Sequence, residues 1–84
     1  MNDPVYYEMA QAMGQRIVRH SEQSIESRLG TAFQIALSRD PAENEVARFE
    51  SFVERQKTNG ASESHVWTLV CQVLLNLDEF VTKE

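Results

Sequence analysis

The stretch VWTLVCQVLLNLDEF, residues 66–80, decides the fold, because its apolar side chains cover almost the whole circumference of a helix. Only a narrow strip stays polar, formed by Thr68, Gln72, Asn76 and Glu79. A helix that is apolar nearly all round has to be enclosed by other elements. We therefore expect a helix from about residue 62 or 64 to residue 80 at the centre of the packing.

Three preceding segments carry one apolar stripe each at the spacing of an amphipathic helix. The first predicted helix ends near His20. The second covers residues 25–37, and the third ends at Asn59-Gly60. No segment shows the alternating pattern of a strand. The first stripe consists of Tyr6, Met9, Ala10, Met13 and Ile17, the second of Ile25, Leu29, Ala32, Phe33, Ala36 and Leu37, and the third of Ala42, Val46, Phe49 and Val53, with Phe52 on its flank.

Both prolines directly follow an aspartate, which is typical of a helix start with Asp as N-cap and Pro at the first helical position. Asp3-Pro4 and Asp40-Pro41 should each begin a helix in this way. Glu43 would reach back to the cap at Asp40 and complete a capping box.

The composition indicates one small domain that spans residues 1–84, with 42% apolar and 25% charged residues in 9.6 kDa. The fold class we predict is all-α: a compact four-helix domain whose last helix is central and mostly buried. The net charge of -5 argues against nucleic acid and anionic membranes as partners. The sequence also lacks a membrane-spanning run and a secretion signal, so we expect a soluble chain without insertion into a membrane.

The chain offers little for catalysis or metal binding. A single cysteine, Cys71, cannot form an internal disulfide, and on a helix it would point about 120° away from His65. His20 and His65 lack an obvious third ligand, which leaves a small metal-dependent enzyme as a remote alternative. We therefore predict no enzymatic activity, no catalytic or metal-binding residue and no cofactor.

Two short motifs resemble a known family. Residues 37–45, LSRDPAENE, and Trp67 followed by residues 74–80, LLNLDEF, are similar to the C-terminal domain of unknown function found in large planctomycete-type multidomain proteins that also carry a cytochrome c-like domain. That family has Leu-Gly-Arg-Pro-Pro-Thr followed by acidic residues, and then a tryptophan helix that ends in Leu-Leu-Asn-x-x-Glu-Phe. The start Asn2-Asp3-Pro4 is similar as well. The matching positions are Leu37, Arg39, Pro41, Glu45, Trp67, Leu74, Leu75, Asn76, Glu79 and Phe80.

The chain departs from this pattern at Ser38, where the family has glycine, and at Ala42, where it has the threonine that would cap the third helix. We expect Asp40 to take over that capping. The resemblance implies that the chain is the C-terminal fragment of a longer parent that is exported or associated with the cell envelope. The haem-binding cysteines and histidine of the cytochrome module are absent here, so we predict no haem.

We expect the matched residues to stabilise the fold rather than to take part in catalysis or binding. Trp67, Leu74 and Phe80 should fill the core, whereas Arg39, Asn76 and Glu79 should form a polar tie between the turn and the central helix. The tie would satisfy polar groups that cost about 1 to 3 kcal/mol each when they are buried without a partner.

Our leading interpretation is a non-catalytic helical module that packs against the rest of its parent or another protein. The alternative is a free-standing helical adaptor that binds another protein or forms a weak homodimer, with Tyr6, Tyr7 and Ile35 as exposed contacts.

Overall fold

The computed structural model consists of four helices, α1 (Pro4–His20), α2 (Ile25–Leu37), α3 (Glu43–Thr58) and α4 (Glu63–Thr82). It describes the backbone of residues 4–20 and 24–82 and the side chains of residues 7–20 and 24–77. No strand occurs in these described segments, and the molecule measures 34 × 29 × 23 Å. The prediction of a compact all-α fold with four helices is therefore confirmed.

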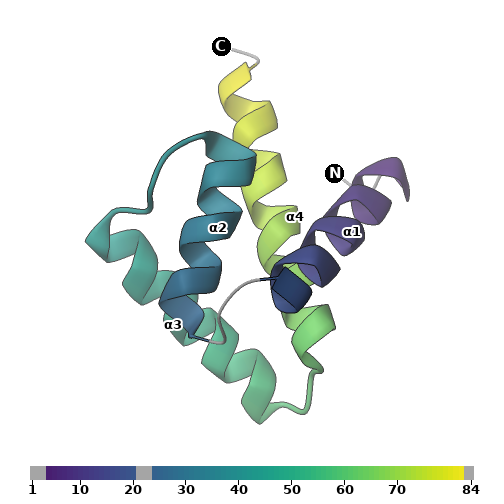
Figure 1. Cartoon of the computed structure of the whole chain (residues 1–84), viewed down its shortest axis with the longest axis vertical. Coiled ribbons are helices and arrows are strands. Elements are labelled where there is room, and N and C mark those ends of the chain that lie inside the picture. The colour runs from purple at the N-terminus through teal and green to yellow at the C-terminus, as the bar shows by residue number, and fades with distance from the viewer. Residues whose placement is uncertain (1–3, 21–23, 83–84) are drawn as a thin grey trace.

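The central position of α4 is confirmed as well, because α1, α2 and α3 all pack against it and the contact with α1 is the most extensive (Figure 1). Among the described side chains of α4, five apolar ones are fully buried, and so is the side chain of Thr68. Thr68 avoids an unsatisfied hydroxyl by donating to the carbonyl of Ser64, 2.8 Å away. The five are Val66, Trp67, Val70, Cys71 and Leu74.

The crossing of α1 and α4 depends on Gly14, a residue that the sequence pattern did not single out. A Cβ atom at Gly14 would lie 2.7 Å from the backbone nitrogen of Thr68 and 2.9 Å from the carbonyl carbon of Trp67. The two backbones can approach this closely only because Gly14 has no side chain. Ala10 and Ile17, which lie on the same face of α1, are fully buried.

This geometry corrects the predicted apolar stripe of α1. Met9 is 47% exposed rather than buried, because the face centred on Gly14 leaves it on the flank of the helix. Met13 is partly buried against the core, as predicted. The side chain of Tyr6 lies outside the described residues.

Both ends of α2 are capped by serines. The hydroxyl of Ser24 accepts a hydrogen bond from the backbone N–H of Ser27, and Ser38 ends the helix in the left-handed conformation at φ 59°. Leu29, Ala32 and Phe33 are fully buried, which confirms the predicted stripe. Phe33 then meets Phe49 of α3 edge to face at 5.7 Å between ring centroids.

The predicted start of α3 is wrong by two residues. The N-cap is Ala42, not Asp40, and Pro41 precedes the cap instead of occupying the first helical position. The carboxylate of Asp40 is engaged elsewhere, since it accepts a hydrogen bond from Gln34 at 2.9 Å. Glu45, not Glu43, reaches back to the cap and accepts the N–H of Ala42 at 2.8 Å.

The end of α3 at Asn59-Gly60 agrees with the prediction. Ala61 N donates to Gln56 O at 3.1 Å and Gly60 N donates to Lys57 O at 2.9 Å, which is the pattern of a Schellman motif. Gly60 has φ 92°, a conformation that glycine adopts without steric cost. The following helix, α4, begins one residue after Ser62, whose hydroxyl accepts the N–H of His65 at 3.2 Å.

Candidate functional site

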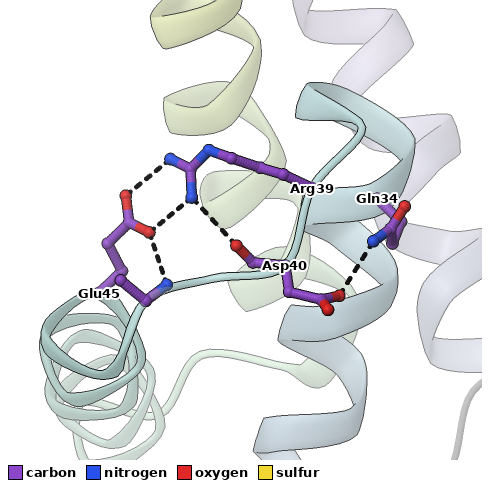
Figure 2. A network of polar contacts seen from close by, with 5 residues as sticks. Gln34, Arg39, Asp40 and Glu45 are labelled. Atoms are coloured by element: carbon purple, nitrogen blue, oxygen red, sulfur yellow. Dashed lines mark hydrogen bonds and ion pairs between the residues drawn. The ribbon is translucent and has the colours of Figure 1, made fainter.

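The residues of the first family-like motif form a polar network at the connection between α2 and α3. Arg39 donates through both terminal nitrogens to Glu45, at 2.8 and 2.9 Å, and also to the carbonyl of Asp40 at 3.1 Å (Figure 2). Glu45 in turn holds the N–H of Ala42. The network therefore joins the end of α2, the connecting residues and the first turn of α3.

Opposite charges and hydrogen bonds shift the ionisation of this pair. The hydrogen bond from Arg39 lowers the pKa of Glu45 to about 2, with help from the N–H of Ala42. The same hydrogen bond raises the pKa of Arg39. The pair is solvent-exposed, and its guanidinium lies 5.3 Å from the ring centroid of Phe33, which anchors the network on the core.

Arg39 and Asn76 do not form the predicted polar tie in the part of the chain that the structure describes. Arg39 hydrogen bonds to Asp40 and Glu45 instead, because these acceptors lie close to it in the connection. Within the described part of the chain the Oδ1 atom of Asn76 is buried without a hydrogen-bond partner. The side chain of Glu79 lies outside the described residues, so its part of the tie stays a prediction.

Trp67 and Leu74, the described residues of the second motif that we expected to fill the core, do lie there. Trp67 and Leu74 are fully buried, and Leu75 packs against the core from its edge. The side chain of Phe80 lies outside the described residues. Trp67 is the largest buried residue, and its indole Nε1 has no hydrogen-bond partner in the described part of the chain. These positions serve packing.

A third feature is a ridge on α4 that carries no charge. Leu69, Val73 and Leu77 follow one another at intervals of one helical turn, so they share a face. Val73 is 41% and Leu77 42% exposed. Leu69 is partly exposed and lies apart from the buried core cluster. We call these three residues the α4 ridge.

The surroundings of the α4 ridge make its exposure unusual. No residue between Val66 and Leu77 is charged, although a quarter of the whole chain is. Gln72 and Asn76, which flank the ridge, are neutral and half-buried. The ridge is thus a neutral, largely apolar helix surface on an acidic protein, which is the kind of surface that contacts another apolar surface.

The structure also contains a polar network that we did not predict from the sequence. Arg28 of α2 is buried, and its Nη1 lies 2.6 Å from Oε1 of Glu63. Lys57 lies 2.6 Å from the other carboxylate oxygen, and Arg28 also donates to the carbonyl of Val18 at 3.4 Å. The network therefore connects all four helices, and the hydrogen bond from Lys57 contributes most to lowering the pKa of Glu63.

A signal for Arg28 does exist in the sequence. It follows Ile25 by three residues and precedes Ala32 by four, so it lies on the apolar stripe of α2. A charged residue on such a stripe indicates a buried ion pair or a stem that runs along the core.

The residues considered for chemistry lie apart. Cys71 is buried, and burial raises the pKa of its thiol to about 12, so the reactive thiolate is disfavoured. His20 and His65 are exposed. Among the described residues no three of His, Cys, Asp and Glu are grouped to hold a metal ion, and none of the described helices has the length and apolar character to cross a membrane.

In comparisons with known proteins, no family model, no curated protein and no solved structure matches the chain.

Proposed function

We propose that the chain is a non-catalytic helical module that packs against another protein surface through the α4 ridge. The observation that carries this proposal is the exposure of Val73 and Leu77 on a helix face without charge. Burying them against an apolar surface would be favourable, at roughly 25 cal/mol for each Å² of apolar area removed from water. The partner surface would be apolar and neutral at its centre.

The partner we favour is the rest of a longer parent, in which this chain is the C-terminal domain of the family named above. Two backbone features support that resemblance. Ser38 has the left-handed conformation, and the family has glycine at this position. Ala42 is the N-cap of α3, and the family has threonine there, a residue that caps helices well.

In this interpretation Ser38 and Ala42, the two departures from the family pattern, leave the fold unchanged but lower its stability. A non-glycine residue in the left-handed region costs about 1 to 2 kcal/mol, and an alanine cap costs about 1 kcal/mol relative to threonine. The bidentate contact between Arg39 and Glu45 offsets part of this cost by tying down the same connection.

The proposal is tested by photo-crosslinking in cells that make the protein. A photoreactive residue replaces Leu77 in one variant, the exposed Ile35 of α2 in a second, and the exposed Glu54 of α3 in a control. We expect crosslinked peptides from position 77 alone. Crosslinks from position 35 alone would favour the adaptor alternative, and none from any position would contradict both.

The size of the native polypeptide separates a parent from a free-standing protein. An antibody against this domain should detect a band much larger than 9.6 kDa in the envelope fraction if the domain belongs to an exported parent. A band at 9.6 kDa in the soluble fraction would favour the adaptor, for which Tyr7 and Ile35 supply exposed apolar contacts on α1 and α2. Sedimentation of the purified chain would then show whether the contact is a weak homodimer.

A further inference from the structure

The turn between α3 and α4 contains the sequence Asn59-Gly60, and both residues are exposed to solvent. An asparagine side chain can react with the backbone nitrogen of the next residue when that nitrogen reaches its carbonyl carbon. Glycine permits this approach best, because it has no Cβ and restricts the backbone least. Asn59 is followed by glycine, whereas Asn44 and Asn76 are followed by Glu45 and Leu77.

We propose that Asn59 is a site of spontaneous deamidation, and that the hydrogen bonds at the end of α3 set its rate in the folded protein. In the first step the backbone nitrogen of Gly60 forms a bond to Cγ of Asn59, and the bond from Cγ to Nδ2 breaks. The former amide proton of Gly60 leaves with Nδ2 as ammonia, and a succinimide ring remains. Water then adds to one of the two ring carbonyls and returns a proton to nitrogen, which yields aspartate or isoaspartate without any change in oxidation state.

The folded turn opposes the first step in two ways. The N–H of Gly60 is held by the carbonyl of Lys57 at 2.9 Å, so the attacking nitrogen is engaged. In addition, ψ of Asn59 is 6°, which places this nitrogen beside the backbone nitrogen of Asn59 rather than beside its Cβ. Ring closure requires rotation about that bond and therefore requires the turn to open.

Opening this turn does not require the core to unfold. Asn59 and Gly60 are exposed, and the hydrogen bond from Gly60 N to Lys57 O joins two exposed residues. Segments with few buried contacts open locally at much lower free energy than the whole domain unfolds. Asn59 is thus protected by the Schellman motif rather than by burial.

The reaction would add a negative charge at the end of α3, and the isoaspartate product would also lengthen the backbone there. A carboxylate at Asn59 lies at the negative end of the α3 dipole, which is unfavourable. Isoaspartate adds a methylene group to the backbone between Thr58 and Gly60 and displaces the hydrogen bonds from Gly60 and Ala61. Both products loosen the contact between Lys57 and Glu63, and Glu63 is the partner of the buried Arg28.

The experiment follows deamidation in the purified chain at mildly alkaline pH by peptide mapping, with isoaspartate resolved from aspartate. The chain is compared in buffer and in urea that unfolds it, and Asn44, which is exposed on α3, serves as the internal control. We expect Asn59 to convert faster than Asn44 in both conditions, and at least about tenfold faster in urea than in buffer, which corresponds to 1.4 kcal/mol of protection. Equal rates at Asn59 in both conditions, or no excess over Asn44, would overturn the proposal.

A second variant distinguishes local from global opening. Leu29→Ala destabilises the core, to which neither Asn59 nor Gly60 belongs, and raises the rate at which a thiol reagent labels the buried Cys71. If the turn opens locally, Asn59 converts at the same rate in this variant as in the original chain. If conversion and Cys71 labelling accelerate by the same factor, the hydrogen bonds of the turn do not set the rate and that part of the proposal fails.

Discussion

At the residue scale, two glycines in helices differ in the space around them: Gly14 is crowded by a neighbouring backbone, and Gly30 is open. A Cβ at Gly14 would meet the backbone of Trp67 and Thr68 at 2.7 to 3.0 Å, whereas a Cβ at Gly30 has no neighbour within 4 Å. Gly14→Ala should therefore destabilise the fold by about 1 to 3 kcal/mol through overpacking. Gly30→Ala should stabilise it by about 0.5 to 1 kcal/mol through helix propensity.

Urea denaturation of both variants measures this difference. The two substitutions are chemically identical, so their opposite signs isolate the effect of the crossing between α1 and α4. A stabilising effect of Gly14→Ala would show that the helices do not approach as closely as the structure places them.

A second residue-scale prediction concerns pH. The pKa of Glu45 is lowered from 4.5 to about 2 in the folded chain, so its ionised form stabilises the fold above the unfolded value. This contribution is present at neutral pH and is lost as the pH falls from 4.5 towards 2. Glu45→Gln removes the charge but keeps an acceptor for Ala42 N–H.

Thermal unfolding of both proteins across this pH range tests the pair. The original chain should be more stable than Glu45→Gln at neutral pH, and the difference should vanish near pH 2. The difference should also shrink in high salt, because the ion pair is exposed. A constant difference between the two proteins at all pH values would contradict the role of the charge.

The residue scale also shows where sequence patterns fail. The apolar stripe of α1 was predicted from hydrophobicity, so it included Met9 and passed over Gly14, whose role depends on the absence of a side chain. The capping at Ala42 was missed because Glu45 provides it from within the helix. The first feature depends on a close approach of two backbones and the second on a hydrogen bond from the backbone to a side chain, and a hydrophobic pattern contains neither.

At the element scale, Arg28 shows that one buried side chain can contact several helices. Arg28 forms an ion pair with Glu63, and Glu63 also pairs with Lys57. A substitution of Arg28 therefore leaves Glu63 with one cationic partner. Arg28→Met preserves the apolar stem and should stay within about 1 kcal/mol of the original stability. Arg28→Ala leaves a cavity and should cost about 2 kcal/mol or more.

Chemical denaturation of these two variants separates packing from charge. Equal and large losses would show that the guanidinium itself holds the helices together. Lys57→Met is the matched control, because Lys57 is exposed and binds the same carboxylate.

The helix boundaries could be predicted well because they depend on local chemistry. Asn59-Gly60 marks the end of α3, and His20 the end of α1, as the sequence indicated. The predicted start of α3 was wrong, since an aspartate before proline is a good cap in general but here binds Gln34, and α4 continues to Thr82 instead of ending at residue 80. The network of Arg28 was missed for a related reason: its partners Val18 and Glu63 are distant in sequence.

At the scale of the whole molecule, Cys71 reports the cooperative opening of the core. Its thiol is fully buried and its pKa is raised to about 12, so a thiol reagent should label it only when α4 leaves the core. Leu29→Ala should cost about 2 to 5 kcal/mol and raise the labelling rate by at least about tenfold.

Ser51→Cys supplies the control, because this exposed position on α3 should react without any delay in either background. Slow labelling at both cysteines would indicate an effect of the reagent rather than of folding. Rapid labelling of Cys71 in the original chain would contradict its placement in a closed core.

The central position of α4 was predictable from a single property, the apolar circumference of residues 66–80, since a central position buries most of its described apolar side chains. The candidate contact site was not. The α4 ridge contains the same residue types as the core, and only the arrangement of the other three helices decides that Val73 and Leu77 stay exposed. Hydrophobicity alone does not distinguish an exposed apolar residue of the α4 ridge from a buried one of the core.

The central position of α4 has a consequence for how the protein is made. Translation releases α1, α2 and α3 from the ribosome before α4, although each of them packs against α4 in the finished fold. Until the last helix emerges, three amphipathic helices expose apolar stripes with nothing to enclose them. The nascent domain therefore cannot complete its fold on the ribosome before α4 is released, and a stop codon ahead of Trp67 would remove Trp67, Val70, Cys71 and Leu74 from the core.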